Sequence, residues 1–391
     1  MSELSWLNDI ASVIRKYITS SYSGVGGVVP QIPVYTEEYP PTEEWTLNGV
    51  TYSVTFVDEK KAFKKHAWNE VKKWDSLLSE KCVIGIDGGS FRIRRDALHF
   101  IGCRAGWGCY STKPDKIETV KMLAKSSLFF LIDSGLLLNV PEDLVARDGK
   151  IGFNNLDNAI FFVGWNPKKA PESQSIGLEA RLRQLTEQLA LRRVRNYLDS
   201  SELDLILIDG KLFPPSVRIN EETLGTLKAL SEKELKVCAV VKDTQLSVFI
   251  GALARRDSSI NPYRYATDIS FMKLFLKPLE SSVFFTYQIT GKEVDEEEWR
   301  PLSVYVKTST GKVFRLEMPY YYLDLGLHHE IVKITLALSE LNNGDIPRPI
   351  QLADSYFKYS VDERRRIALW LDAIFLNEKG IKLTKPYGEV L

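Results

Sequence analysis

The sequence predicts an α/β protein built on a mixed β-sheet that is flanked by helices. Short strand-like runs cluster between residues 83 and 111, and helical and strand-like segments alternate after Pro171. Clustered strands followed by alternating helices and strands are typical of a mixed sheet covered by helices. The chain has 391 residues, which is long enough for one large domain with insertions or for two domains.

The first eighty residues are predicted to form an N-terminal extension. Apolar residues at helical spacing predict a helix over 4–17, and a stretch rich in Gly, Pro and Ser predicts a long loop over 20–41. A second helix is expected over 58–80, directly before the first strand of the main domain. The predicted division is therefore an extension of helices and loop, 1–80, and a main domain, 81–391, with an insertion around 141–171.

The other elements follow in chain order from their periodicity and from the turn residues between them. Strands are expected over 83–87, 97–103, 106–111, 205–209, 235–241, 283–289, 302–308 and 313–318. Helices are expected over 117–131, 178–198, 220–230, 268–279, 322–341, 349–357 and 361–376. The sequence contains no internal repeat and no low-complexity tract that would indicate a repeat protein.

The composition is that of an ordinary globular protein and argues against several classes. Lys plus Arg equal Asp plus Glu at 51 each, so no global charge indicates nucleic acid binding. The four cysteines are scattered without a Cys-x-x-Cys pair, which disfavours a disulfide scaffold or a structural zinc site. No signal peptide and no apolar run of membrane-spanning length is apparent, so we expect a cytoplasmic protein without a membrane segment.

Two strands that each end in Asp-Gly are the most informative feature of the chain. The first is Val-Ile-Gly-Ile-Asp87-Gly-Gly and the second is Leu-Ile-Leu-Ile-Asp209-Gly. Each strand delivers a carboxylate to its carboxyl end, and the glycines let a ligand approach the backbone. Two carboxylates that converge in this way suit Mg²⁺ or Mn²⁺ acting on phosphates, because hard cations bind several oxygen ligands.

Three further residues are candidates for the same site. On a helical wheel of 178–198, Glu187 lies in the middle of an apolar stripe, where a carboxylate is usually paired or bound to a metal. An ion pair with Arg183 or Arg195 would explain Glu187 equally well. Asp354 follows a proline-containing loop at the start of a helix, where favourable helix-start electrostatics is the alternative role. Lys242 ends a strand and can contact a phosphate, although lysine is common at strand ends.

The order of these acids resembles that of the NurA nucleases, the RNase H-like partners of the HerA-type hexameric translocase in archaea and some bacteria. Ile86–Ser90 resembles the first metal strand of the family, and Arg183–Glu187 resembles its Arg-x-x-x-Glu helix. Leu207–Leu212 is similar to the Asp-Gly-Ser-Leu segment, with Lys211 where serine is usual. Three other segments also resemble family motifs: Val237–Lys242, Arg315–Pro319 and Pro347–Asp354. The resemblance covers roughly residues 83 to 360.

This resemblance implies an RNase H-like fold and a metal-dependent DNA nuclease. Its expected activities are 5′–3′ exonuclease and single-strand endonuclease cleavage beside a HerA-like ATPase, in DNA end resection and double-strand break repair by homologous recombination. A homodimer is implied. Two Mn²⁺ or Mg²⁺ ions would be held by four acids, with a lysine beside the scissile phosphate: Asp87, Glu187, Asp209, Asp354 and Lys242. Some relatives carry histidine at the position of Asp354.

Two other functions fit part of the pattern. In an actin-like ATP-dependent kinase, Gly85–Ser90 would serve as the phosphate-binding hairpin, but the late Gly-Gly adenosine motif of that class is missing from the sequence. A catalytically silent DNA-binding adaptor of the same fold would keep the strands without the chemistry. Protection against heat separates the enzymes, because ATP should stabilise the kinase and Mn²⁺ alone should stabilise the nuclease.

Overall fold

The computed structural model describes residues 42–379, except 48–49, 58–63, 96–97, 114–118, 126–128, 133–160, 165–170, 198–202, 214–216, 244–246, 258–259, 261–266 and 290–295. The predicted helix 4–17, the predicted loop 20–41 and most of the predicted insertion around 141–171 lie outside these residues. None of the described helices has the length and apolar character needed to cross a membrane.

Within the described residues, fourteen strands form one sheet. They are β1 (Thr42–Leu47), β2 (Val50–Phe56), β3 (His66–Ala67), β4 (Cys82–Arg95), β5 (Leu98–Ser111), β6 (Thr119–Lys125), β7 (Phe129–Ile132), β8 (Phe161–Gly164), β9 (Leu205–Asp209), β10 (Val237–Val241), β11 (Glu280–Ser281), β12 (Phe285–Ile289), β13 (Pro301–Lys307) and β14 (Val313–Pro319). The main path runs β1-β2-β12-β13-β14-β10-β9-β4-β5-β7-β8, with β6 paired to β5, β11 paired to β13, and β3 paired to β11.

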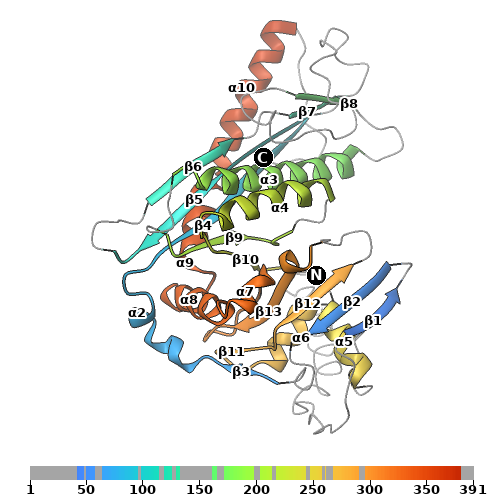
Figure 1. Ribbon diagram of the computed structural model, residues 1–391. Coiled ribbons are helices and arrows are strands. Elements are labelled where there is room, and N and C mark those ends of the chain that lie inside the picture. Colours follow the sequence, from blue (N-terminus) through green and yellow to red (C-terminus); the bar gives the residue numbers. More distant parts are fainter. Residues whose placement is uncertain are drawn as a thin grey trace, which may run out of the picture.

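The described helices cover both faces of this sheet. They are α2 (Trp74–Leu77), α3 (Pro171–Val194), α4 (Val217–Ser231), α5 (Val248–Arg256), α6 (Asp268–Phe275), α7 (Tyr321–Asp324), α8 (His328–Leu341), α9 (Arg348–Phe357) and α10 (Val361–Lys379). Figure 1 shows α3 and α4 on one side of β9 and β10, with α8 and α9 on the other side. α10 extends away from the body of the molecule beside the far end of β4.

The centre of the sheet confirms the predicted RNase H-like arrangement. Antiparallel strands β4, β5 and β6 are followed by β9 and β10, which run parallel to β4, so the strand order is β6-β5-β4-β9-β10. Helix α3 connects the first part to β9, and α4 connects β9 to β10. β4 continues to Arg95 beside β5, so Asp87 lies within this strand and not at its end as predicted. Because the parallel strands β9 and β10 end at the level of Asp87, this topology gathers Asp87 and the side chains that follow β9 and β10.

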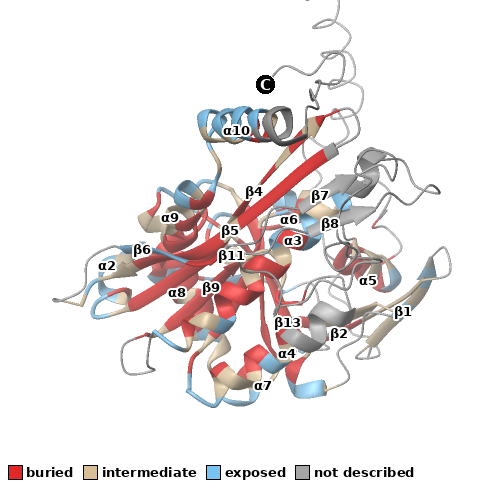
Figure 2. Cartoon of the chain, turned by 90° about the horizontal axis from the view of Figure 1, so that it is seen from above, coloured by how far each residue is buried: buried red, intermediate tan, exposed pale blue. Residues whose placement is uncertain are grey.

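Two apolar layers hold the helices on the sheet. Ile84 and Ile86 of β4 and Ile206 of β9 pack with the apolar stripe of α3, whereas Val83 and Leu205 pack with α8 and α9 on the opposite face. Side chains alternate between the two faces of a strand, so a continuous apolar run buries both faces. Figure 2 shows this buried centre in red and the largely exposed surface of α10 in blue.

The structure corrects several predicted elements. Residues 117–131 were expected to be helical, but β6 and β7 occupy this region and pair with β5. The backbone of β5 offers a free edge there, and pairing with it outweighs the local helical pattern. The predicted strands 97–103 and 106–111 are one strand, β5. In place of the predicted helix over 58–80, the described part holds β3, a 3₁₀-helix (Asn69–Lys73) and the short α2.

Part of the predicted N-terminal extension pairs with the main sheet. β2 forms an antiparallel ladder with β12, and β1 pairs with β2. Trp68, Val71 and Leu78 are buried in the same apolar cluster as α8. The sequence analysis predicted neither these two strands nor α5. The division into 1–80 and 81–391 stays a prediction, and residues 42–78 make these contacts with the predicted main domain.

Candidate active site

The register of β4 and β9 places the two Asp-Gly carboxylates side by side. Ile86 pairs with Ile208 in this parallel ladder, and Asp87 and Asp209 are the next residue of each strand. Asp87 is only 2% exposed, and its Oδ1 accepts a hydrogen bond of 2.7 Å from the Gly88 N–H. The other oxygen, Asp87 Oδ2, is buried and has no hydrogen-bond partner among the described residues. A buried carboxylate oxygen without a donor is costly unless a proton or a cation binds it.

Glu187 reaches the same place from helix α3. A Cβ atom added to Gly88 would lie 2.9 Å from Glu187 Cγ and 3.0 Å from Glu187 Oε1. Gly88 therefore leaves the space that lets the glutamate side chain approach β4. Glu187 Oε1 also lies 3.6 Å from Arg183 Nε, one helical turn earlier. The ion pair with Arg183 that was considered for Glu187 is therefore present, and the same carboxylate lies against Gly88, the residue after Asp87.

Lys242 lies against the second aspartate. β10 runs parallel to β9, with Val240 opposite Asp209, so Lys242 follows the strand end on the same edge of the sheet. Its Nζ lies 2.8 Å from Asp209 Oδ2, and both side chains are partly buried. In this arrangement the lysine ammonium supplies positive charge directly to a carboxylate of the site.

Asp354 is carried to the site by helix α9. A Cβ added to Gly85 would lie 2.3 Å from Ile350 N, and one added to Gly89 would lie 1.9 Å from Phe357 O. The helix therefore lies directly on β4, on the face that Gly85, Asp87 and Gly89 share by strand alternation. The negative charge of Asp354 contributes to raising the pKa of Lys242. Asp354 thus belongs to the same electrostatic group as the other acids.

The site raises the pKa of two of its carboxyl groups, those of Asp87 and Glu187. Burial raises the pKa of Asp87, and the negative charges of Asp209 and Glu187 raise it further. Burial also raises the pKa of Glu187, an effect that the Arg183 guanidinium reduces. Burial alone would lower the pKa of Lys242, but the neighbouring Asp209 raises it overall. An acidic cluster of this kind favours the binding of protons or cations.

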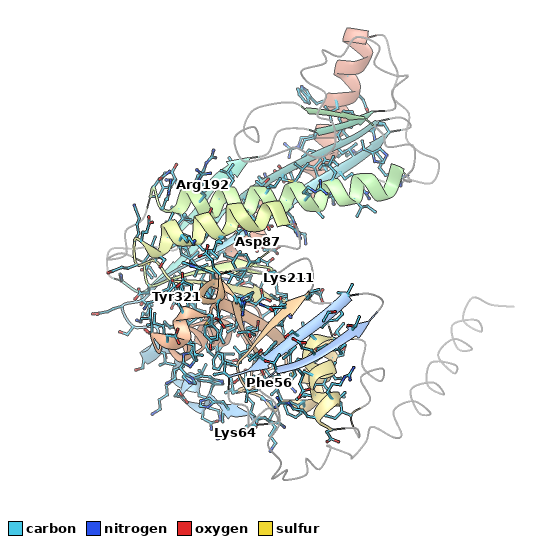
Figure 3. All side chains as sticks on the ribbon, turned by 45° about the vertical axis from the view of Figure 1, so that its right-hand side comes forward. Phe56, Lys64, Asp87, Arg192, Lys211 and Tyr321 are labelled. Atoms are coloured by element: carbon cyan, nitrogen blue, oxygen red, sulfur yellow. The ribbon has the colours of Figure 1, made fainter. Side chains whose placement is uncertain are left out.

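A pocket of about 240 Å³ lies beside these residues, between α3 and the ends of β9 and β10. It is lined by Arg183, Gln184, Glu187, Gln188, Ile208, Asp209, Gly210, Lys211, Val241 and Asp243. Figure 3 shows Asp87 and Lys211 near the middle of the molecule, below the layer of α3 and α4. The described residues contain no three His, Cys, Asp or Glu side chains already arranged to ligate a metal.

A family model matches most of the chain. The NurA domain model aligns with residues 81–359, which is well over half of the sequence. The chain belongs to the NurA family. The predicted resemblance is thereby confirmed, and membership in the NurA family supports a nuclease function. None of the curated proteins matches this chain.

Solved structures similar to this NurA-family chain include two NurA proteins. The NurA nuclease from Sulfolobus solfataricus is 18% identical, with 79% of this chain and 92% of that chain covered and a TM-score of 0.44. A NurA structure with manganese is 10% identical, with 80% and 94% covered and a TM-score of 0.39. Endonuclease V from Streptomyces avermitilis is 14% identical, with 78% and 96% covered and a TM-score of 0.27.

Two buried polar residues near the candidate site were given no role there by the sequence analysis. Gln188 is 3% exposed and lines the pocket, and its Oε1 has no hydrogen-bond partner among the described residues. Glu317 is fully buried on β14, and its Oε2 accepts a hydrogen bond of 2.9 Å from the Leu212 N–H, just after Asp209. A polar residue beside Glu187 was the available signal for Gln188. The Arg-x-Glu-x-Pro resemblance indicated Glu317 without indicating its contact.

Proposed function

We propose that this NurA-family protein is a metal-dependent DNA nuclease, with 5′–3′ exonuclease and single-strand endonuclease activity. The observation that carries the proposal is the register that sets Asp87 beside Asp209 with Glu187 against Gly88. A nuclease needs a concentration of negative oxygen ligands where a phosphodiester can be attacked, and these three carboxylates supply it. The adjoining pocket provides access from solvent.

The site residues fit a divalent cation. Asp87 Oδ2 is a buried acceptor without a donor among the described residues, and burial together with nearby negative charge raises the pKa of Asp87 and of Glu187. Their oxygens are the hard ligands that Mn²⁺ and Mg²⁺ prefer. We assign four residues as metal ligands, for two ions in all: Asp87, Glu187, Asp209 and Asp354. When bound, such ions lower the pKa of a water and neutralise the charge on the leaving oxygen.

Lys242 and Arg183 are the cationic side chains of the proposed mechanism. Lys242 Nζ lies 2.8 Å from Asp209, and Arg183 is half exposed at the rim of the pocket. We assign Lys242 to hold the scissile phosphate as a point charge and Arg183 to orient Glu187. Contacts of this kind address the phosphate and not the base, so we expect cleavage without sequence specificity.

The proposed biological role follows from the family. NurA membership supports action on single-stranded DNA and duplex ends beside a HerA-like hexameric ATPase, in double-strand break repair by homologous recombination. We also propose a homodimer that works in the cytoplasm. These assignments rest on the family alone and are tested separately from the chemistry.

The decisive experiment is incubation of the purified protein with end-labelled linear DNA in Mn²⁺, Mg²⁺ or EDTA. Asp87→Asn is assayed in parallel, with Asp324→Asn as a matched control, because Asp324 is an exposed acid on α7. Metal-dependent shortening by the wild type and by Asp324→Asn, but not by Asp87→Asn, is the expected result.

Other outcomes separate the alternatives. Cleavage that appears only after a HerA-like ATPase is added would identify a partner-dependent nuclease. DNA binding without cleavage in every condition would favour the silent adaptor. Protection against heat by ATP, and not by Mn²⁺, would favour the kinase. Equal cleavage by wild type and Asp87→Asn would remove Asp87 from the site.

A further inference from the structure

The turn that carries Asp209 is held by two hydrogen bonds that its backbone N–H groups donate. The Gly210 N–H donates to Val240 O at 3.0 Å, and Gly210 adopts a φ of 101°, a conformation that favours glycine. Two residues later, the Leu212 N–H donates to Glu317 Oε2 at 2.9 Å. The second bond comes from a different part of the chain, because Glu317 lies on β14, two strands away from β9.

Register explains how Glu317 reaches this turn. Ala239 of β10 pairs with Ile208 on one side and with Glu317 on the other. Glu317 is therefore level with the last strand residue before Asp209, and its side chain spans β10 to meet the backbone after Asp209. This geometry sets the position of the turn relative to the sheet.

Glu317 is itself fixed by buried partners. The Tyr287 O–H donates to Glu317 Oε1 at 2.9 Å, and Arg315 Nη2 lies 2.6 Å from the same oxygen. Both Arg315 and Glu317 are fully buried. Replacing a buried ion pair with apolar residues is often neutral or stabilising, so the pair is poorly explained as a source of stability alone. A role in fixing the geometry of the site accounts for it.

The contacts continue beyond this pair. Arg315 Nη1 donates to the Tyr305 hydroxyl at 3.2 Å, and that hydroxyl donates to Asp268 Oδ2 at 2.9 Å. Asp268 also accepts the backbone N–H groups of Phe249 and Ile250 at the start of α5. A continuous buried polar network thus runs from α5 to the Asp209 turn.

We propose that Glu317 is a positioning residue, which holds the Asp209 turn so that Asp209 and Lys211 face the pocket. This inference rests on the proposed nuclease function of the same site. Glu317 touches neither the pocket nor the acids, so it acts through the backbone of the turn. Second-layer residues of this kind typically change metal affinity or activity by about 10- to 100-fold.

Glu317→Gln tests the inference with little change in side-chain shape. Arg315 can only donate, so it requires the oxygen of the new amide, and the NH₂ group is then directed at the Leu212 N–H, where two donors face each other. We expect faster amide hydrogen exchange in a peptide spanning 209–213, without metal or DNA. We also expect Mn²⁺ binding weakened by about 10- to 100-fold in calorimetry, with cleavage partly restored at high Mn²⁺.

The matched control is Glu43→Gln. Glu43 Oε1 lies 2.9 Å from Arg256 Nε, so this variant changes a comparable, largely buried pair away from the Asp209 turn. It should lose stability and keep the Mn²⁺ affinity and the exchange rate of 209–213. If Glu317→Gln behaves like this control, Glu317 is only structural and the inference is overturned.

Two further outcomes are decisive. If Glu317→Gln does not fold, Tyr287→Phe removes one hydrogen bond from the same carboxylate. Faster exchange at 209–213 would then support the inference, and unchanged exchange would overturn it. If the wild type binds no Mn²⁺ and cleaves no DNA, the proposed nuclease function fails. The exchange measurement still decides whether Glu317 holds the turn.

Discussion

The buried carboxylate of Asp87 is unfavourable for stability and central to the proposed function. Its carboxylate is buried, one oxygen has no donor among the described residues, and Asp209 and Glu187 are close enough to raise its pKa. Such an environment costs stability whenever the group is ionised. The binding of a cation explains such a site, because a bound cation favours the ionised form of the carboxyl group over the protonated form.

Replacing Asp87 with asparagine should separate these two effects. We expect Asp87→Asn to lose metal-dependent cleavage by at least about a hundredfold, because an amide is a poor ligand for a hard cation. In EDTA at pH 8 the variant should unfold at a higher temperature than the wild type, because asparagine neither buries a charge nor has to take up a proton when the protein folds. Cleavage assays and thermal unfolding check the two halves, and Asp209→Asn should lose activity similarly. Full activity in both variants would contradict the assigned site.

Helix α9 packs directly on glycines of the strands beneath it. Gly85 and Gly89 of β4 and Gly108 of β5 have no room for a Cβ atom, because backbone atoms of α9 lie within 2.7 Å of each position. The same close approach carries Asp354 over β4. The absence of side chains at these glycines therefore allows both the packing of α9 and the approach of Asp354 to the site.

Gly85→Ala should displace α9. The new methyl group would lie 2.3 Å from Ile350 N, a backbone atom that cannot rotate away. Overpacking of this kind typically costs about 1–3 kcal/mol of unfolding free energy, and we expect cleavage to fall with it. Gly177→Ala on α3 is the matched control, because its Cβ would meet nothing within 4 Å. That change should stabilise the helix by about 0.5–1 kcal/mol. Denaturant unfolding of both variants measures the difference.

Helix α10 is tied to β4 by an ion pair between the buried Arg95 and the partly exposed Asp372. Arg95 is 1% exposed and donates two hydrogen bonds to Asp372, at 2.8 and 2.7 Å. Asp372→Ala would leave this guanidinium buried without its counter-charge. Removing one partner of a buried pair can cost about 3–5 kcal/mol, so we expect α10 to undock.

Hydrogen exchange followed by mass spectrometry would measure the undocking. Peptides from α10 should exchange faster in Asp372→Ala, while peptides from β9 and β10 keep their wild-type rates. Arg365→Ala, an exposed position on the same helix, is the control and should leave α10 protected. Unchanged exchange of α10 in Asp372→Ala would show that the other contacts of the helix, among them the Arg104–Glu363 pair, suffice to hold it.

The whole molecule should respond to pH through its acidic cluster. The pKa of Asp87 rises from 3.8 to about 9, and that of Glu187 rises from 4.5 to about 8, first because of burial. A raised carboxyl pKa means that the native state binds more protons than the unfolded state between the two values. The free energy of unfolding therefore falls as pH rises, by up to about 1.4 kcal/mol per pH unit and group.

Thermal unfolding in EDTA between pH 5 and pH 9 would test this dependence. The wild-type Tm should fall across the range, and Asp87→Asn should fall less steeply. Mn²⁺ should raise the wild-type Tm more at pH 8 than at pH 6, because bound cations displace protons from the carboxyls. A Tm shift with Mn²⁺ that is independent of pH would contradict the assigned ligands.

Local patterns were sufficient for the strands and helix that carry the first acids. β9 and β10 match their predictions closely, and α3 is a helix as predicted but begins at Pro171 and ends at Val194, because apolar runs and helical stripes indicate which faces are buried better than they indicate where an element ends. The same reasoning failed at 117–131, where an apolar segment suits either structure and the free edge of β5 decides. It also missed β1 and β2, although Asn48-Gly49 between them is a strong hairpin signal in sequence.

By itself, the sequence determined the mixed α/β class, the buried strands that carry Asp87 and Asp209 and the apolar stripe around Glu187, whereas the predicted strand end at Asp87 was wrong because β4 continues to Arg95. Each of these features depends on residues that are close together in the sequence, so the spacing of apolar residues is enough to predict it. Only the tertiary structure decided the contact between Lys242 and Asp209, the place of Asp354 on α9 and the reach of Glu317 to the Leu212 N–H. These contacts join segments separated by tens to hundreds of residues, and their energy comes from close packing and buried hydrogen bonds.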